Sequence, residues 1–181
     1  TLIVVASKHG QSPIDPTKFA KVSPSLVTAA TGVNVSFQTS DDIALLFLAN
    51  SSDTDAAVAG LNKARFDLRI QDIIYGPQLI AKHFGNPASD PAVPDIIVRP
   101  IGGVIYTDGE GKIANHGGLS GDSRHVACFV HAANLKHKKF KCRVSTRRVG
   151  PTILKVLGLN PHDLLGAKAD HTKVLHGFSH K

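Results

Sequence analysis

The chain has 181 residues, 42% of them apolar, which suits one domain with an ordinary hydrophobic core. The longest apolar run, residues 43–49, has the length of a strand and falls far short of the roughly 18 residues that a membrane span needs. The sequence therefore predicts no membrane span. A net charge of +7 permits acidic partners but identifies none.

The first predicted element is a strand over residues 2–6, an unbroken aliphatic run of the kind found in parallel sheets buried on both faces. Strands and helices then alternate along the chain, which predicts an α/β fold with a mostly parallel sheet. No linker or repeat divides the sequence, so we expect a single domain over residues 1–181. The further predicted strands are residues 33–37, 43–48, 96–98, 104–106 and 126–130. The predicted helices are residues 54–65 and 78–84, one around Ile153, Leu154 and Leu157 that ends at Gly158, and one that restarts at residues 160–163.

Several features favour a secreted protein. The chain opens directly in an apolar strand, which we interpret as a mature or nicked product. Cys128 and Cys142 form either one disulfide or two buried thiols, and an even pair fits an oxidising compartment. Asn34 and Asn50 each stand in an N-glycosylation sequon.

Two His-Gly pairs are the candidate metal ligands. His9 and Gly10 follow the first strand, and ligands of open α/β sheets bind at the carboxyl ends of strands. His116 precedes two glycines in a polar loop. A histidine held in this way can present one ring nitrogen to a metal while a partner fixes the other. The alternative for either residue is a surface or hydrogen-bonded histidine.

Six blocks of the sequence, in order along nearly the whole chain, resemble type I phosphodiesterase/nucleotide pyrophosphatase-like proteins of the alkaline-phosphatase superfamily. The resemblance is to the C-terminal portion of those proteins. The blocks are TLIVVASKHGQSPID (residues 1–15), DDIALL (41–46), PDIIV (94–98), GVIY (103–106), KIANHGG (112–118) and GPTILKVLGL (150–159).

The resemblance implies an alkaline-phosphatase-like α/β/α sandwich and hydrolysis of phosphate esters by paired divalent metal ions, usually zinc. It implies that His9 binds one metal and His116 the other. Two cations about 3.5–4 Å apart can stabilise the attacking and leaving oxygens of an in-line displacement. In the family, the nucleophile and the remaining carboxylate ligands lie before the motif that Lys8 and His9 match. We therefore expect a C-terminal fragment that is inactive without its N-terminal portion.

Lys8 departs from the resemblance, because much of the superfamily has a metal-binding Asp at that position. The exchange of a carboxylate for an ammonium should weaken binding of the second cation, and Lys8 could instead contact a phosphate oxygen. Asp122 and His125 follow His116 and are either further ligands, supporting groups or part of a solvated loop. Asp41 and Asp42 are predicted to cap or solvate the start of a strand rather than form an acid/base pair.

The segment from Lys136 to Arg148 is strongly basic and could bind nucleic acid or a sulfated glycan, although a solvated loop is the simpler explanation. Its one aromatic residue, Phe140, gives no base-stacking platform. A truncated sheet also exposes an edge, which predicts association with the N-terminal portion or with a second copy. Three hypotheses follow: a phosphoesterase fragment, a non-catalytic secreted metal or anion binder, and a polyanion binder.

Overall fold

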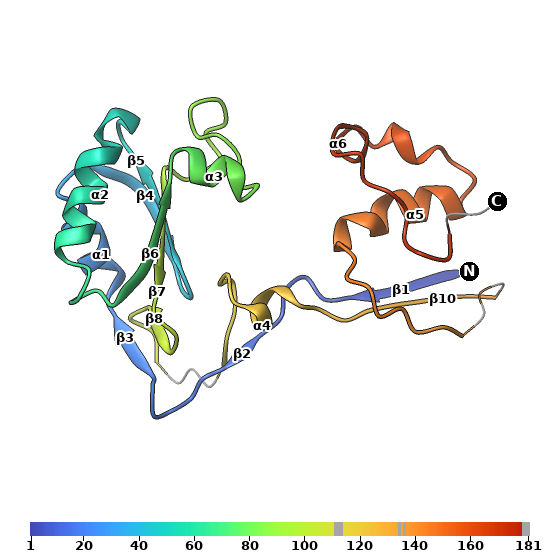
Figure 1. The fold of residues 1–181 in the computed structure, drawn as a ribbon, viewed down its shortest axis with the longest axis horizontal. Coiled ribbons are helices and arrows are strands. Elements are labelled where there is room, and N and C mark those ends of the chain that lie inside the picture. Colours follow the sequence, from blue (N-terminus) through green and yellow to red (C-terminus); the bar gives the residue numbers. More distant parts are fainter. Residues whose placement is uncertain (111–113, 134, 136, 179–181) are drawn as a thin grey trace. The chain divides into compact units, whose positions relative to one another are not determined.

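The computed structural model describes residues 1–110, 114–133, 135 and 137–178 (Figure 1). They form two compact units, His9–His125 on the one hand and Thr1–Lys8 with Val126–Lys181 on the other. Whether the chain behaves as the predicted single domain stays a prediction. Within the described residues, the helices are all too short or too polar to cross a bilayer.

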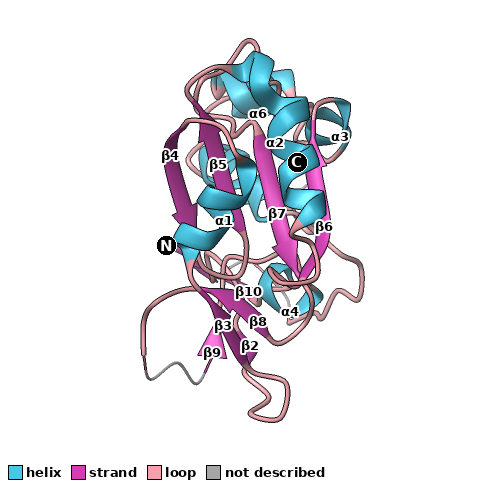
Figure 2. Ribbon diagram, turned by 90° about the vertical axis from the view of Figure 1, so that its left-hand side faces the viewer, coloured by secondary structure: helices cyan, strands magenta, loops and turns pink. Residues whose placement is uncertain are grey.

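The unit His9–His125 is built around a four-stranded sheet. Its strands are β4 (Val35–Ser40), β5 (Ala44–Leu48), β6 (Ile70–Tyr75) and β7 (Ile96–Pro100), in the spatial order β4-β5-β7-β6. Every neighbouring pair is antiparallel. Figure 2 shows the four strands side by side.

Helices cover both faces of this sheet. Helices α1 (Pro24–Thr31) and α2 (Thr54–Lys63) pack on one face, and α3 (Pro77–Ala81) lies on the other (Figure 1). Strand β7 alternates between the two, because a strand directs successive side chains to opposite faces. The first core contains Val27, Leu46, Ala57, Leu61, Ile96 and Val98, and the second contains Ile74, Leu79 and Ile97.

The prediction of a mostly parallel, alkaline-phosphatase-like sheet is wrong. Only residues 41–43 join β4 to β5, whereas a parallel crossover needs about a dozen residues or more. Strands β5 and β6 do run in one direction with α2 between them, which explains the α/β alternation in the sequence. Strand β7 lies between them and runs the opposite way. The fold is mixed α/β with mostly antiparallel small sheets.

Two short strand pairs and a short helix complete this unit. Strand β2 (Ser12–Pro13) pairs antiparallel with β9 (Ala114–Asn115), and β3 (Ala20–Val22) pairs parallel with β8 (Val104–Tyr106). Helix α4 spans Gly121–Arg124, and a 3₁₀ turn, Ser51–Asp53, precedes α2.

The Tyr106 hydroxyl donates to the Leu68 carbonyl oxygen at 3.1 Å, and burial raises the pKa of this tyrosine.

The other unit contains a two-stranded sheet and a group of short helices. Strands β1 (Leu2–Ala6) and β10 (Cys128–Ala132) pair antiparallel. Strand β1 is not buried on both faces as predicted, since Ile3 and Val5 are 51% and 59% exposed. The remaining elements are the 3₁₀ turns Thr146–Arg148 and Pro161–Asp163 and helices α5 (Val149–Val156) and α6 (Leu165–Ala169).

Most predicted elements exist at or near their expected positions. The Asn160 side chain accepts from the amide of His162, as expected for the restart after α5, and Gly158 adopts a left-handed φ of 75° where α5 ends. Helix α1 has no counterpart among the predicted elements. Pro24 begins it and the left-handed Gly32 ends it.

We predict that Gly60→Ala destabilises the protein by about 1–3 kcal/mol, the usual cost of overpacking. A Cβ at Gly60, inside α2, would lie 2.2 Å from the Ala30 carbonyl oxygen of α1. A glycine to alanine change in a helix interior normally stabilises a protein by roughly 0.5–1 kcal/mol. A loss of stability in Gly60→Ala would therefore report the close contact with α1. Urea denaturation measures the change. Gly102→Ala is the control, because a Cβ there meets nothing within 4 Å. Equal stability of the two variants would contradict the close α1–α2 contact.

Candidate functional site

The two predicted histidine ligands lie together. The ring centroids of His9 and His116 are 4.0 Å apart and the ring planes differ by 2°, although more than a hundred residues separate them in sequence. Both belong to the unit His9–His125. The two imidazoles therefore stack on each other, and their roles as metal ligands stay a prediction.

Gly10 fixes the position of His9. Its amide donates to the Ser123 carbonyl oxygen at 2.8 Å, and a Cβ at this position would lie 1.8 Å from the backbone oxygen of Asp122. Only glycine permits this approach of the chain to α4.

A backbone contact sets the tautomer of His9. Its Nδ1 lies 2.9 Å from the carbonyl oxygen of Gly10. A carbonyl oxygen can only accept, so Nδ1 donates and carries the hydrogen. The lone pair of the neutral ring then resides on Nε2, which is the arrangement that a second partner imposes on metal-binding histidines.

The carboxylate of Asp42 holds the loop that carries His116. Its Oδ2 accepts from the amide of Gly118 at 3.1 Å and from the hydroxyl of Ser123 at 3.3 Å. Asp42 thus ties the His116 loop and α4 to the strand β5, which begins two residues later.

Asp41 holds the same loop through a second contact. Its Oδ1 accepts from the side-chain amide of Asn115, which is 2% exposed and precedes His116. We expected Asp41 and Asp42 to cap or solvate the start of a strand, and their contacts with the His116 loop were not predicted. Nothing in the local pattern signals them, because the partners are more than seventy residues away in sequence.

The other predicted site residues are exposed. Lys8 precedes His9, and Asp122 and His125 lie in and directly after α4. Across residues 1–110, 114–133, 135 and 137–178, no three His, Cys, Asp or Glu side chains gather closely enough to hold a metal ion. Asp122 and His125 therefore add no third ligand to the two histidines in this structure.

The two imidazoles fit zinc in donor type, since neutral histidine nitrogens are common zinc ligands. They do not form a complete site, because a catalytic zinc usually has three protein ligands. The described residues thus supply part of a donor set, and no catalytic step follows from them alone.

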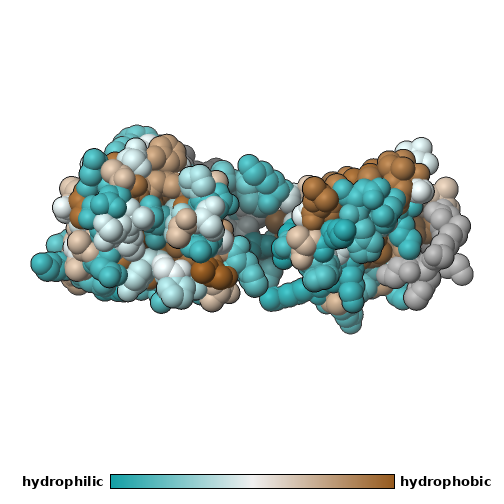
Figure 3. Space-filling view, turned by 90° about the horizontal axis from the view of Figure 1, so that it is seen from above, coloured by the Kyte–Doolittle hydropathy of each residue, from teal (hydrophilic) through white to brown (hydrophobic). Residues whose placement is uncertain are grey.

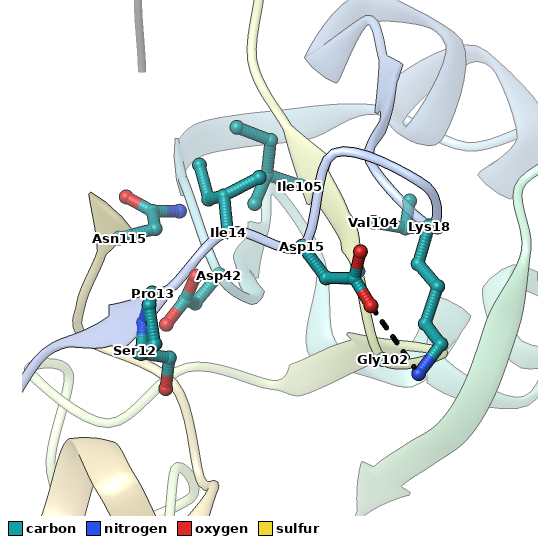
Figure 4. A pocket seen from close by; sticks show the side chains of 11 residues that line it. Ser12, Pro13, Ile14, Asp15, Lys18, Asp42, Gly102, Val104, Ile105 and Asn115 are labelled. Atoms are coloured by element: carbon teal, nitrogen blue, oxygen red, sulfur yellow. Dashed lines mark ion pairs between the residues drawn. The ribbon is translucent and has the colours of Figure 1, made fainter. Parts of the chain in front are cut away.

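A cavity of about 460 Å³ lies beside the loop that Asp42 holds (Figure 4). Asp15, Lys18 and Asp42 bring the charges to its wall, and an ion pair of 3.5 Å joins Asp15 to Lys18. Two carboxylates against one ammonium disfavour a phosphate dianion there. Ser12, Ile14, Val104, Ile105 and Asn115 are among the other lining residues.

The basic segment is exposed where the structure describes it. Lys138, Lys139, Lys141 and Arg143 are exposed, and Lys136 lies outside the described residues. Both cysteines are free, with Cys128 half-buried and Cys142 exposed, so the structure holds two thiols rather than the disulfide. Secretion and glycosylation stay predictions.

Comparisons of the chain with protein families, with curated proteins and with solved structures found no match. Membership of the phosphodiesterase family accordingly stays a prediction, and the function has to be argued from the geometry of the histidine pair.

We predict that Asp42→Ala frees the His116 loop. The Gly118 amide loses its acceptor, and an unsatisfied group of this kind costs roughly 1–3 kcal/mol. Amide hydrogen exchange at Gly118 should accelerate, and urea denaturation should show the lower stability. Asp67→Ala, at an exposed turn, is the control and should change neither. Unchanged exchange at Gly118 in Asp42→Ala would show that the carboxylate does not hold the loop.

We predict that Thr17→Val raises the pKa of Asp15. The hydroxyl and amide of Thr17 both donate to Asp15 Oδ1, at 2.7 and 3.0 Å, and they hold the pKa of this carboxyl below its ordinary value. Because the pKa of Asp15 is lowered in the folded protein, its ionised carboxylate stabilises the fold at pH values above the unfolded-state pKa. This stabilisation is lost as the pH falls through the folded-state pKa. The hydroxyl is the largest cause, so its loss should move the pKa upward in an NMR titration. Ser89→Ala, at an exposed loop, is the control and should leave it unchanged.

Proposed function

We propose that this chain supplies two histidine ligands, His9 and His116, to a divalent metal centre, most simply zinc, that hydrolyses phosphate esters. The observation that carries the proposal is the parallel pair of rings 4.0 Å apart. Two-metal hydrolytic sites place their cations about 3.5–4 Å apart, and parallel imidazoles with this ring spacing suit one cation each where their free nitrogens face the same side.

The surroundings of the pair support this proposal. His9 is held in the tautomer that leaves Nε2 available, and the His116 loop is tied down by two aspartates. Such partners orient ligands and raise metal affinity. A metal bound there would act as a Lewis acid on the phosphate ester, while the residues of this chain orient it.

Catalysis requires groups that the described residues do not provide. They contain no group of three metal-binding side chains, and the resemblance places the nucleophile and the carboxylate ligands before Lys8. We infer that these groups come from the N-terminal portion of the same protein.

A second candidate is a metal-binding protein without catalytic activity. The incomplete donor set favours it directly, because two histidines bind zinc without completing a hydrolytic centre.

Zinc binding and hydrolysis together test the proposal. Isothermal titration with zinc should show binding to the chain that falls at least about tenfold in His9→Ala and in His116→Ala, the scale on which single ligands act. His162→Ala, an exposed histidine of the other unit, is the matched control and should leave affinity unchanged.

Hydrolysis of bis(p-nitrophenyl) phosphate, assayed with zinc and again after chelation, separates the two candidates. Turnover that appears when the preceding portion of the protein is present and that chelation abolishes supports the phosphoesterase. Binding without turnover in that longer protein supports the non-catalytic binder. Zinc affinity that is equal in His9→Ala, His116→Ala and the unaltered chain would overturn both.

A further inference from the structure

Charge is segregated between the two units. The unit of residues 1–8 and 126–181 has twelve Lys and Arg against two Asp, a net charge of +10 by sequence. The unit His9–His125 has nine Lys and Arg against twelve acidic residues, a net charge of −3. We call the former the basic unit and the latter the acidic unit. The net charge of the whole chain, +7, is therefore smaller than that of the unit of residues 1–8 and 126–181 alone. Such a charge asymmetry points to a polyanionic partner.

The same basic unit exposes an unusual amount of apolar surface. Ile153 and Val156 on α5 and Leu157 at its C-cap have helical spacings of three and four residues, and they are 39%, 39% and 67% exposed. The residues of α5 that are buried are instead Pro151 and Thr152. The apolar stripe of this helix thus faces outward.

Leucines of the neighbouring segment extend this stripe. Leu159, Leu164 and Leu165 are 53%, 38% and 79% exposed, and the turn Pro161–Asp163 packs against both α5 and α6. Figure 3 shows apolar residues (brown) gathered along one side of this unit, beside polar ones (teal). Contiguous exposed apolar surface of this kind marks an interaction site. We call Ile153, Val156, Leu157, Leu159, Leu164 and Leu165 the leucine patch.

We propose that the leucine patch docks on the surface of an anionic phospholipid membrane. Leucines enter the boundary between headgroups and acyl chains, and lysines and arginines meet the phosphate and carboxylate groups. Lys168 lies one helical turn after Leu164 and Leu165 and is exposed, so apolar and cationic side chains are neighbours within α6.

Further basic side chains belong to the same unit. The exposed Lys138 lies 5.1 Å from the centre of the Phe140 ring, which in turn stacks on His176. The basic segment therefore packs on the C-terminal segment of this unit. Lys139, Lys141 and Arg143 follow it and are also exposed.

A membrane accounts for both the exposed leucines and the positive charge of this unit better than nucleic acid does. Binding to a nucleic acid backbone uses the positive charge but gives the exposed leucines no partner. Base stacking uses aromatic side chains, and the leucine patch contains none. The proposal does not depend on the metal centre, because His9 and His116 belong to the other unit.

Cosedimentation with vesicles tests the proposal. The chain should bind vesicles of phosphatidylcholine with phosphatidylserine, bind vesicles of phosphatidylcholine alone far more weakly, and dissociate with added salt. The double variant Leu157→Glu with Leu165→Glu should bind at least about tenfold more weakly, since each leucine loses its apolar burial. Lys138→Ser, Lys139→Ser and Lys141→Ser should each weaken binding about fivefold.

Leu26→Glu is the matched control, since Leu26 is 56% exposed on α1 of the acidic unit and should not alter vesicle binding. Tighter binding to duplex DNA or heparin, unchanged in the leucine variants, would overturn the proposal in favour of a polyanion binder. A leucine variant that changes the molecular mass in light scattering but not vesicle binding would assign the patch to self-association. Absence of binding to either vesicle would also overturn it.

Discussion

The burial of strand β7 on both faces is the constraint from which the acidic unit is built. Ile96 and Val98 pack under α1 and α2, and Ile97 packs under α3, so the strand has no freedom of register. Antiparallel pairing with β7 then fixes β5. Asp41 and Asp42 lie in the turn before β5, and their side chains bind the loop of His116. The register of the sheet therefore helps to set the position of this loop. The position of a surface histidine thus follows from the central strand, although the two are unrelated in local sequence.

Local patterns predicted the existence of most elements but not their directions. Apolar runs such as residues 43–48 and 96–98 are strands because β-branched and aliphatic side chains suit a buried sheet, and that holds in either direction. The length of the connection between β4 and β5 was the available sign of an antiparallel pair. Residues 2–6 show that an apolar run does not predict burial either. This run forms a strand as expected, but the strand is half exposed in a two-stranded sheet.

The candidate site was predictable only in part, for a similar reason. The proximity of His9 and His116 came from a resemblance and not from spacing, since more than a hundred residues of chain separate them. The roles of Asp41, Asp42 and Gly10 arise from contacts with residues distant in sequence, and no periodicity encodes such contacts. The resemblance also implied a parallel sandwich that is absent from the described residues. The proposal of metal binding therefore depends on the geometry of the two rings and their partners, whereas the proposed hydrolysis of phosphate esters still depends on the resemblance.

The division of charge and the division of proposed roles coincide. The acidic unit holds the histidine pair, and the basic unit holds the leucine patch. Asp41 and Asp42 hold the loop that carries His116, and the negative charge of their carboxylates would favour a cation bound at the proposed site. An anionic surface is instead attracted by uncompensated lysines and arginines. One set of side chains cannot serve both purposes, because carboxylates that favour cations would repel the lipid headgroups. The two proposals therefore assign cation binding and lipid binding to separate units, and this division agrees with their net charges of −3 and +10.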